Sequence, residues 1–534
     1  MPPWLLAGAL ALALAAVQWL PLLDHLSQTR RGGLTSGETA VLSLPTSYLT
    51  GLLWADRGGF HEWMTYVGIS VLVLALLGWL TLRLRERVGA ALGLALLVLF
   101  ALGDNGPLYP LLANLPGLAL LRVPPRVWFL VSFVAALLAG LGAAALAGGG
   151  RDLDGHRRGL SRLAVAAVGL AAFLALAVCV VNRTAAGAPF LAAFWLLLAV
   201  LSCALPRRWA WPPWAAGALL ALLVAAELVW MDVSLAAARP AEQLFSDGWE
   251  TAAVVATETQ DRVYAPSFRP PPQVAAAAGM RMVNGVEPLA LANYSAFLRA
   301  AASVPADGGY DVTLPPLREG EPDASVALAD AVPSPWLLAV LDVDIVVSQF
   351  PLASSSLEEL FYHDGERLTV YRNLADIAWP AVFQRVESVP DFDAALAWMQ
   401  AQPGALDHKA VVTGGRSLFG PPGHVPAELV HLSPNRLLVT ATGPGLLVLS
   451  EVFHPGWQAT VDGEPAEIVE ANAVLRGVYL GEGGGTHRVE MVYRPWAVTA
   501  GAILSLAALA FWVVGRGVAP VARVARVPRR ACGP

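Results

Sequence analysis

Acidic side chains follow the apolar stretches of this chain at points where a carboxylate could do acid–base or metal chemistry beside a membrane. Asp24 comes directly after the apolar stretch 4–23, and Glu38, Asp56 and Glu62 lie in the polar segment that follows. A carboxylate beside an acceptor hydroxyl can take its proton as a general base, or can hold a metal ion that orients the reacting groups. Asp24 and Glu38 are therefore candidate catalytic residues, although Asp24 also suits a purely structural helix end.

Paired arginines mark candidate sites for a phosphate group. Arg122 and Arg126 flank two prolines just before a long apolar stretch, and Arg30 and Arg31 are adjacent in the chain. The planar guanidinium group binds phosphate through two parallel hydrogen bonds, so these four side chains are candidates for binding a donor phosphate. The alternative for Arg122 and Arg126 is an anchor at the membrane interface or an ion pair with Asp104.

Two further side chains allow both a chemical and a structural interpretation. Glu227 lies inside an apolar stretch, five residues before Asp232. A carboxylate inside a membrane is costly and often functional, but Glu227 is close enough to the end of its stretch to reach the aqueous surface. Trp457, which follows Pro455 and Gly456, could stack on a sugar ring or could be a core aromatic residue of a β-domain.

The composition is that of a polytopic membrane protein. Of 534 residues, 56% are hydrophobic and 14% are charged, whereas an ordinary soluble protein has about 25% charged residues. The net charge of −6 provides no basic surface for nucleic acid, so the expected partner is the lipid bilayer. Cys179, Cys203 and Cys532 all lie outside the large polar region, which predicts no disulfide framework and no zinc site there.

Hydrophobic stretches of about twenty residues predict about eight transmembrane helices. They are 4–23, 66–82, 88–103, 127–148, 163–182, 189–206, 213–232 and 496–515. Arginine is concentrated in one alternating set of connections, with fourteen residues against six in the other set. Because arginine-rich connections stay in the cytoplasm, both termini are predicted to be cytoplasmic, and the loops 24–65 and 104–126 and the region 233–495 are predicted to face outward.

The outward-facing region is long enough for two domains. Its first part mixes helix and strand patterns, among them a helix followed by a buried strand in Trp336–Phe350. The second part has short alternating runs broken by turn residues, including the hairpin signal Asp462-Gly463, which predicts a β-sandwich. Its expected strands are Leu437–Thr442, Leu446–Phe453, Gln458–Val461, Ala466–Val469, Val474–Leu480 and His487–Tyr493.

The predicted domain organisation follows from these patterns. Its parts are a membrane domain 1–232 with seven helices, a mixed α/β region 233–404, a β-sandwich 405–495, and a segment 496–534 with the eighth helix and a basic cytoplasmic tail. A sandwich of this kind could bind carbohydrate or a partner, or could serve as a rigid cap, because a fold alone does not define a function.

Several motifs resemble the YfhO-like family of bacterial membrane proteins, and they follow one another along the chain in the same order as in that family. The runs SEVFHPGWQATVDG, EANAVLRGV and GGTHRVEMVYRP resemble the carboxyl-terminal end of that family, and GMRMVNGVEPLALANYSAFL (279–298) and the segment 103–142 resemble motifs upstream. The run AAVQWLPLLDHLSQTRRGGL (15–34) resembles a middle segment of the longer members. The chain is therefore expected to lack the amino-terminal helices and the first acidic loop of that family.

The resemblance has implications for activity. YfhO-like proteins are similar to GT-C glycosyltransferases, which transfer a sugar from a polyprenyl-phosphate donor to an acceptor on the outer side of the membrane. The resemblance therefore implies a protein of the bacterial cytoplasmic membrane that acts on a cell-envelope glycopolymer or lipid. A divalent metal is a candidate cofactor. The expected site is where the loops 24–65 and 104–126 meet the membrane. The alternative is a non-catalytic, membrane-anchored envelope scaffold or glycan-binding protein.

Overall fold

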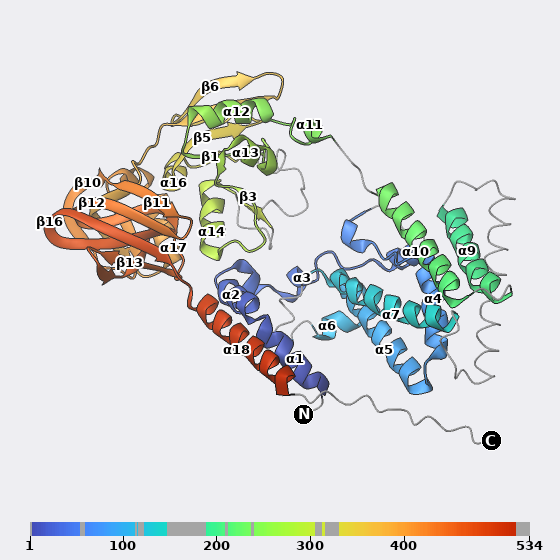
Figure 1. Ribbon diagram of the computed structural model, residues 1–534. Coiled ribbons are helices and arrows are strands. Elements are labelled where there is room, and N and C mark those ends of the chain that lie inside the picture. Colours follow the sequence, from blue (N-terminus) through green and yellow to red (C-terminus); the bar gives the residue numbers. More distant parts are fainter. Residues whose placement is uncertain are drawn as a thin grey trace, which may run out of the picture. The chain divides into compact units, whose positions relative to one another are not determined.

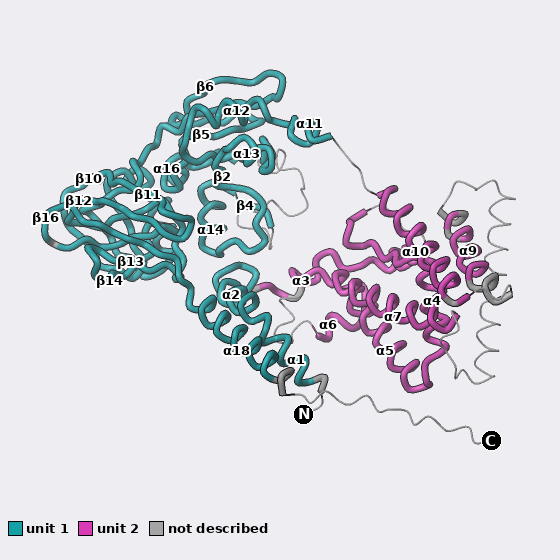
Figure 2. The backbone as a smooth tube through the Cα atoms, viewed as in Figure 1, with its two compact units in different colours: residues 1–33, 240–534 teal, residues 34–239 magenta. Residues whose placement is uncertain are grey.

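The chain forms two compact units. The computed structural model describes residues 3–53, 59–112, 115, 122–146, 188–208, 212–235, 240–304, 312–315 and 331–518. One unit combines residues 1–33 with residues 240–534, and the other comprises residues 34–239 (Figure 2). The first unit is therefore built from both ends of the chain.

Both units contain apolar helices, which make this a membrane-associated protein. The helices in the described residues that are long and apolar enough to cross a membrane are Pro124–Leu146, Trp214–Val233 and Trp496–Val514. A fourth candidate is the pair Leu5–Leu14 and Ala16–Leu26, which bends by 69°. The expected stretch 163–182 lies outside the described residues, so the count of eight spans stays a prediction.

The second unit is helical over its described residues. Its helices are α3 (Ser36–Thr39), α4 (Ile69–Thr81), α5 (Leu84–Ala101), α6 (Leu108–Leu112), α7 (Trp128–Leu146), α9 (Ala188–Arg208) and α10 (Pro213–Leu235), with the short 3₁₀ helices η2 (Thr46–Leu52), η3 (His61–Trp63), η4 (Gly103–Asn105) and η6 (Pro124–Val127). Helices α4 and α7 approach closely at Gly78 and Gly142. A Cβ on Gly78 would lie 1.8 Å from the carbonyl oxygen of Leu138, so only glycine permits this backbone contact.

The first unit contains a sheet-rich region and its own helices (Figure 1). The helices are α1 (Pro3–Leu14), α2 (Ala16–Leu26), η1 (Arg30–Gly33), α11 (Ala241–Leu244), α12 (Trp249–Glu258), α13 (Pro272–Ala278), α14 (Ala292–Ala301), α16 (Pro335–Val340), α17 (Phe392–Ala401), η7 (Pro403–Asp407) and α18 (Trp496–Val518). Local signals account for several of these ends. The Asp391 carboxylate, for example, accepts a 2.8 Å hydrogen bond from the Ala394 N–H and caps α17.

A five-stranded mixed sheet forms the first part of the sheet-rich region. Its order is β2-β1-β5-β7-β6, and β1 runs parallel to both β2 and β5. The strands are β1 (Arg262–Tyr264), β2 (Arg281–Met282), β5 (Val343–Ser348), β6 (Leu357–His363) and β7 (Leu368–Asn373). The helix α16 and the buried strand β5 confirm the helix–strand pattern predicted for Trp336–Phe350. A separate pair joins β3 (Gly285–Val286) and β4 (Thr313–Leu314).

A nine-stranded sheet forms the second part. Its strands are β8 (Ala381–Val389), β9 (Ala410–Thr413), β10 (Leu418–Pro426), β11 (Glu428–Ser433), β12 (Arg436–Val452), β13 (Trp457–Val461), β14 (Glu464–Ala466), β15 (Ile468–Ala471) and β16 (Leu475–Tyr493). The pairings β12–β8–β9–β15–β16–β12 form a closed ring. Residues 437–443 of β12 alternate between buried and more exposed positions, with Val439 fully buried, which matches the alternating pattern in the sequence, whereas residues 445–450 are all buried.

The helix α18 begins three residues after β16 and lies along α1 and α2 in the same unit (Figure 1). Gly501 permits close contact, since a Cβ there would lie 2.6 Å from the carbonyl oxygen of Ala16. The hydroxyl of Ser505 accepts a 3.0 Å bond from the Val17 N–H and donates to the Ala13 carbonyl at 3.3 Å. The Ser505 side chain thus inserts into the hydrogen-bond ladder between α1 and α2, which accounts for the bend.

Candidate functional site

The carboxyl end of α2 is bonded both to α18 and to the segment before α14. The Asp24 Oδ1 accepts a 3.2 Å hydrogen bond from the indole Nε1 of Trp496, the first residue of α18. The neighbouring His25 bonds through Nε2 to the carbonyl oxygen of Leu289 at 3.0 Å. The predicted catalytic carboxylate of Asp24 therefore has a partner that joins two helices.

His454, in the turn between β12 and β13, lies against this end of α2. Its ring stacks on that of His25 with centroids 5.7 Å apart, and it meets the ring of Tyr493 edge-on at 5.4 Å. The Gly456 N–H donates to His454 Nδ1 at 3.0 Å. Burial and the neighbouring His25 lower the pKa of His454, while Asp24 opposes this effect. The neutral ring is therefore the favoured form in this junction.

A buried arginine, Arg476, and a half-buried one, Arg262, share one carboxylate near the same turn. Glu451 bonds to Arg262 at 3.0 Å and to Arg476 at 3.2 Å. The Arg476 side chain is 2% exposed, and its guanidinium carbon lies 4.0 Å from the centroid of the Trp457 ring. Burial lowers the pKa of Arg476 to about 10, with Glu451 opposing and Arg262 adding to the decrease. Trp457 therefore covers a buried cation with one face of its indole.

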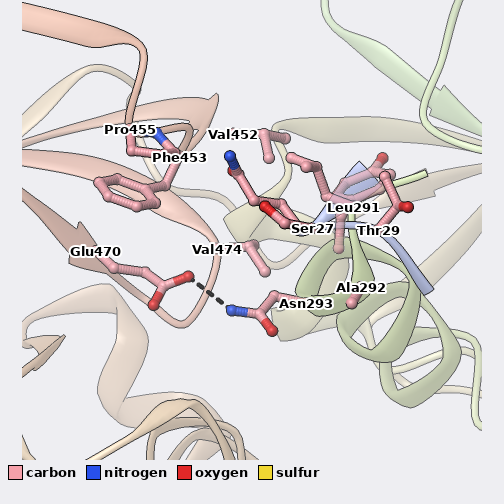
Figure 3. A pocket seen from close by; sticks show the side chains of 12 residues that line it. Ser27, Thr29, Leu291, Ala292, Asn293, Val452, Phe453, Pro455, Glu470 and Val474 are labelled. Carbon is pink, nitrogen blue, oxygen red and sulfur yellow. Dashed lines mark hydrogen bonds between the residues drawn. The ribbon is translucent and has the colours of Figure 1, made fainter. Parts of the chain in front are cut away.

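A cavity of about 430 Å³ includes Phe453 and Pro455, the two neighbours of His454 in the chain, among its lining residues (Figure 3). It lies between three segments that are far apart in the sequence: the residues after α2, the start of α14, and the ends of β12 and β15 with the turns that follow them. The Ala292 N–H donates to the Gln28 carbonyl at 2.9 Å, which joins the first two segments. The lining consists of Ser27, Gln28, Thr29, Leu291, Ala292, Asn293, Tyr294, Val452, Phe453, Pro455, Glu470 and Val474.

Glu470 is the carboxylate of this cavity. It lies in β15, directly opposite Arg476 of β16, and the Asn293 Nδ2 donates to its Oε1 at 3.0 Å. Burial raises the pKa of Glu470, and the bond from Asn293 partly opposes this. Such a carboxyl group can accept hydrogen bonds from a ligand, or exchange a proton closer to neutral pH than an exposed glutamate can.

A strained turn positions Glu470. Asn472 and Ala473 have positive φ angles of 43° and 65°. The buried Asn472 accepts a 3.1 Å bond at Oδ1 from the Val411 N–H, and its own N–H donates to the Val411 carbonyl at 2.7 Å. These two bonds hold the β15–β16 hairpin against β9, so the register that places Glu470 opposite Arg476 follows from them.

The residues predicted to bind phosphate fall in both units. Arg30 and Arg31 form the start of η1, directly after the cavity-lining Thr29, in the same unit as Asp24. Arg122 and Arg126 belong to the other unit. The structure therefore brings Arg30 and Arg31 into the segment that borders the cavity.

Within the second unit, the predicted residues have local partners. The Glu38 Oε2 accepts bonds of 2.8 Å from both the N–H and the hydroxyl of Thr35, an arrangement typical of a helix capping box, at the start of α3. Arg126 pairs with Glu62 at 2.7 Å and not with Asp104, the ion pair considered as one alternative to phosphate binding. Asp104 instead bonds through its backbone N–H to the Ser43 hydroxyl.

Glu227 has a role that the sequence did not indicate. Its side chain is fully buried, and it accepts hydrogen bonds from the Tyr66 hydroxyl, from the Ile69 N–H at 2.5 Å and from the Ser70 N–H at 2.9 Å. It therefore caps the amino terminus of α4 from α10 instead of extending to an aqueous surface.

Sequence reasoning did not select Glu470 or Asn293. Both lie in runs that carry the family resemblance, EANAVLRGV and GMRMVNGVEPLALANYSAFL, so a signal was present. Neither run contains a local pattern typical of catalysis, and the two residues are 177 positions apart. Asp56 and the basic tail lie outside the described residues.

The site carries no preformed metal centre within the described ranges. No group of three or more His, Cys, Asp and Glu side chains that could hold a metal ion occurs there. The candidate divalent cofactor therefore has no ligand set among these residues.

Fold and site together define a membrane-associated protein with a sheet-rich region that encloses a carboxylate-containing cavity next to the apolar helices α2 and α18. Comparison of the chain with protein-family models, with curated proteins and with solved structures gives no match.

Proposed function

We propose that this protein binds a sugar of the cell envelope in the cavity that contains Glu470 and Asn293. The observation that carries the proposal is the hydrogen-bonded Glu470–Asn293 pair inside a cavity of about 430 Å³. This volume lies within the range of small-molecule sites. A carboxylate and an amide side by side suit neighbouring sugar hydroxyls, because one accepts hydrogen bonds and the other both donates and accepts.

Further lining side chains support a sugar as the ligand. Ser27, Gln28 and Thr29 add polar groups on one side, and Phe453 adds an aromatic ring on the other. Mixed polar and aromatic walls match the two kinds of surface that a pyranose ring presents, namely hydroxyl edges and an apolar face.

The position of the cavity supports a lipid-linked sugar. The lining residue Ser27 follows α2 directly, and α2 and α18 are the apolar helices that meet the sheet-rich region. Arg30 and Arg31 come directly after Thr29 and suit the phosphate of a polyprenyl-phosphate donor. The proposal includes the predicted topology, with about eight spans, both termini in the cytoplasm and the sheet-rich region outside.

The YfhO-like resemblance extends the proposal to a reaction. In this form the protein is a GT-C-related enzyme that transfers the sugar to an envelope glycopolymer or lipid. In this form Glu470 and Asn293 hold and orient the sugar for transfer. Within the described residues, no group of side chains could hold a metal ion for a metal-dependent form of this reaction.

The second candidate is a non-catalytic glycan-binding scaffold. It is favoured by the structural use of the two predicted catalytic carboxylates: Asp24 bonds to Trp496, and Glu38 bonds to Thr35. Both candidates require the sugar to bind, and they differ only in turnover.

The test uses the full chain in lipid nanodiscs, with sugar binding measured by calorimetry. Glu470→Gln keeps an oxygen that can accept the Asn293 bond, so the fold should survive while sugar binding weakens about tenfold or more. Glu467→Gln is the matched control, because Glu467 is exposed, is three residues away and does not line this cavity. Unchanged binding in Glu470→Gln would show that the proposal is wrong. Turnover of a polyprenyl-phosphate-linked sugar separates the enzyme from the scaffold.

A further inference from the structure

The cavity has an unbalanced negative charge. Among its twelve described lining residues, Glu470 is the charged one, and none is Lys, Arg or His. Its Oε1 accepts the hydrogen bond from Asn293, which is a neutral donor. Arg476 lies opposite in the sheet register, but its guanidinium group pairs with Glu451 and stacks on Trp457 instead.

A part-buried carboxylate without a cationic partner is costly. Removing an ionised group from water disfavours its charged form unless an opposite charge or hydrogen-bond donors compensate. Burial raises the pKa of Glu470, and Asn293 is the opposing cause. None of the described lining residues supplies a positive charge to compensate the Glu470 carboxylate, and a bound ligand can supply it.

The same charge disfavours an anionic group inside the cavity. A phosphate beside Glu470 would place two like charges together with no cation on the walls, which costs free energy at low dielectric. Any phosphate on the ligand therefore stays outside this cavity, on the side of Arg30 and Arg31, which follow Thr29.

We propose that the cavity recognises an amino sugar whose amine is free and protonated, with the ammonium group bonded to Glu470 between Asn293 and Phe453. This inference rests on the proposed function, because it names the chemical class of the sugar bound at the same cavity. The ammonium group donates three hydrogen bonds and neutralises the carboxylate, whereas an acetylated amine carries no charge and adds bulk.

The test compares four probes on the full chain in nanodiscs at neutral pH: glucosamine, N-acetylglucosamine, glucose and glucose 1-phosphate. We expect glucosamine to bind about tenfold more tightly than glucose, a difference of ~1.4 kcal/mol. Glucose 1-phosphate should bind more weakly than glucose. In Glu470→Gln, the advantage of glucosamine should disappear, while Glu467→Gln should retain it.

The outcomes separate this inference from the proposed function. Equal binding of glucosamine and glucose by the unaltered chain overturns the amino-sugar inference and leaves sugar binding intact. Binding of none of the sugars contradicts the proposed function and this inference together. A preference for glucosamine that survives in Glu470→Gln shows that the charge is recognised elsewhere, and it also overturns the inference.

Discussion

The indole nitrogen of Trp496 donates a hydrogen bond to the carboxylate of Asp24, 3.2 Å away, and joins the first turn of α18 to the last turn of α2. The two helices come from opposite ends of the chain, and α18 follows directly from the long strand β16. The contact therefore fixes α2 to α18 at the end where α18 leaves the sheet-rich region and where α2 leads to the cavity-lining Ser27.

Substitutions of Asp24 test whether this contact is architectural. Asp24→Asn keeps an oxygen that can accept the Trp496 bond, so the free energy of unfolding should change by less than about 0.5 kcal/mol. Asp24→Ala and Trp496→Phe should each lose about 1 kcal/mol. Because both remove the same bond, the double variant should lose little more than either single one. Chemical unfolding of the full chain in detergent measures these values, and additive losses would contradict the assignment.

The buried charge network at Glu451 predicts a larger effect. Glu451→Gln leaves Arg262 and Arg476 without their shared carboxylate, and breaking a buried pair costs about 3–5 kcal/mol. A matched control is Glu490→Gln, since Glu490 pairs with Arg436, which is 53% exposed, at 2.7 Å on the same sheet. Exposed pairs of this kind contribute little, so this variant should change the free energy of unfolding much less. Equal losses of unfolding free energy in the two variants would show that Glu451 does not hold a buried network.

The alternating pattern of the carboxyl-terminal region predicted most strand positions, because it reports which side chains face a core. Strand β13 covers the expected Gln458–Val461, and Asp462 and Gly463 form its hairpin turn with positive φ angles of 54° and 90°. These signals are local, since a turn with two positive φ angles needs particular residues whatever the rest of the chain does.

Strand length was not predictable in the same way. The turn residues around Pro444 suggested a break between two strands, but β12 continues from Arg436 to Val452, with register shifts between Gly443 and Gly445 and again between Leu449 and Val452. A Cβ on Gly445 would lie 2.7 Å from the carbonyl oxygen of Phe383, so glycine at this position lets β12 approach β8 closely. A sequence does not show whether a glycine ends a strand or permits such a contact.

The cavity was beyond sequence reasoning for a different reason. It joins residues 27–29, 291–294 and 452–474, and no local pattern says which distant segments meet. The carboxylates that stood out in the sequence, Asp24 and Glu38, stood out because of their position beside apolar stretches. The Trp496 partner of Asp24 became visible only in three dimensions, whereas Thr35 precedes Glu38 at the spacing of a helix capping box.

The stacked histidines predict a dependence of stability on pH. The pKa of His454 is lowered in the folded state, chiefly by burial and then by His25, so the unfolded chain binds more protons between the folded pKa and about 6.5. The contribution of His454 to the free energy of unfolding is therefore fully present above about pH 6.5. It is lost as the pH falls through the pKa that His454 has in the folded state. His454→Gln should flatten this slope in thermal unfolding curves, whereas His431→Gln, at an exposed position on β11, should not. A slope that His454→Gln leaves unchanged would contradict the assignment.

The cap on α4 leads to the last prediction, in the second unit. Glu227→Ala removes the acceptor for two buried backbone N–H groups and for the part-buried Tyr66 hydroxyl. Loss of the helix cap, which the two backbone N–H groups form, costs about 0.5–2 kcal/mol, and the Tyr66 hydroxyl left unpaired adds about 1–3 kcal/mol. We therefore expect a loss of unfolding free energy of about 2–5 kcal/mol, and a smaller loss in Glu227→Gln, which keeps one acceptor oxygen. Asp232→Asn, at an exposed position five residues further along α10, is the control and should behave like the unaltered chain. If Glu227→Ala were as stable as Asp232→Asn, the carboxylate would be free of a structural role, and a functional role for it inside the membrane would be the better explanation.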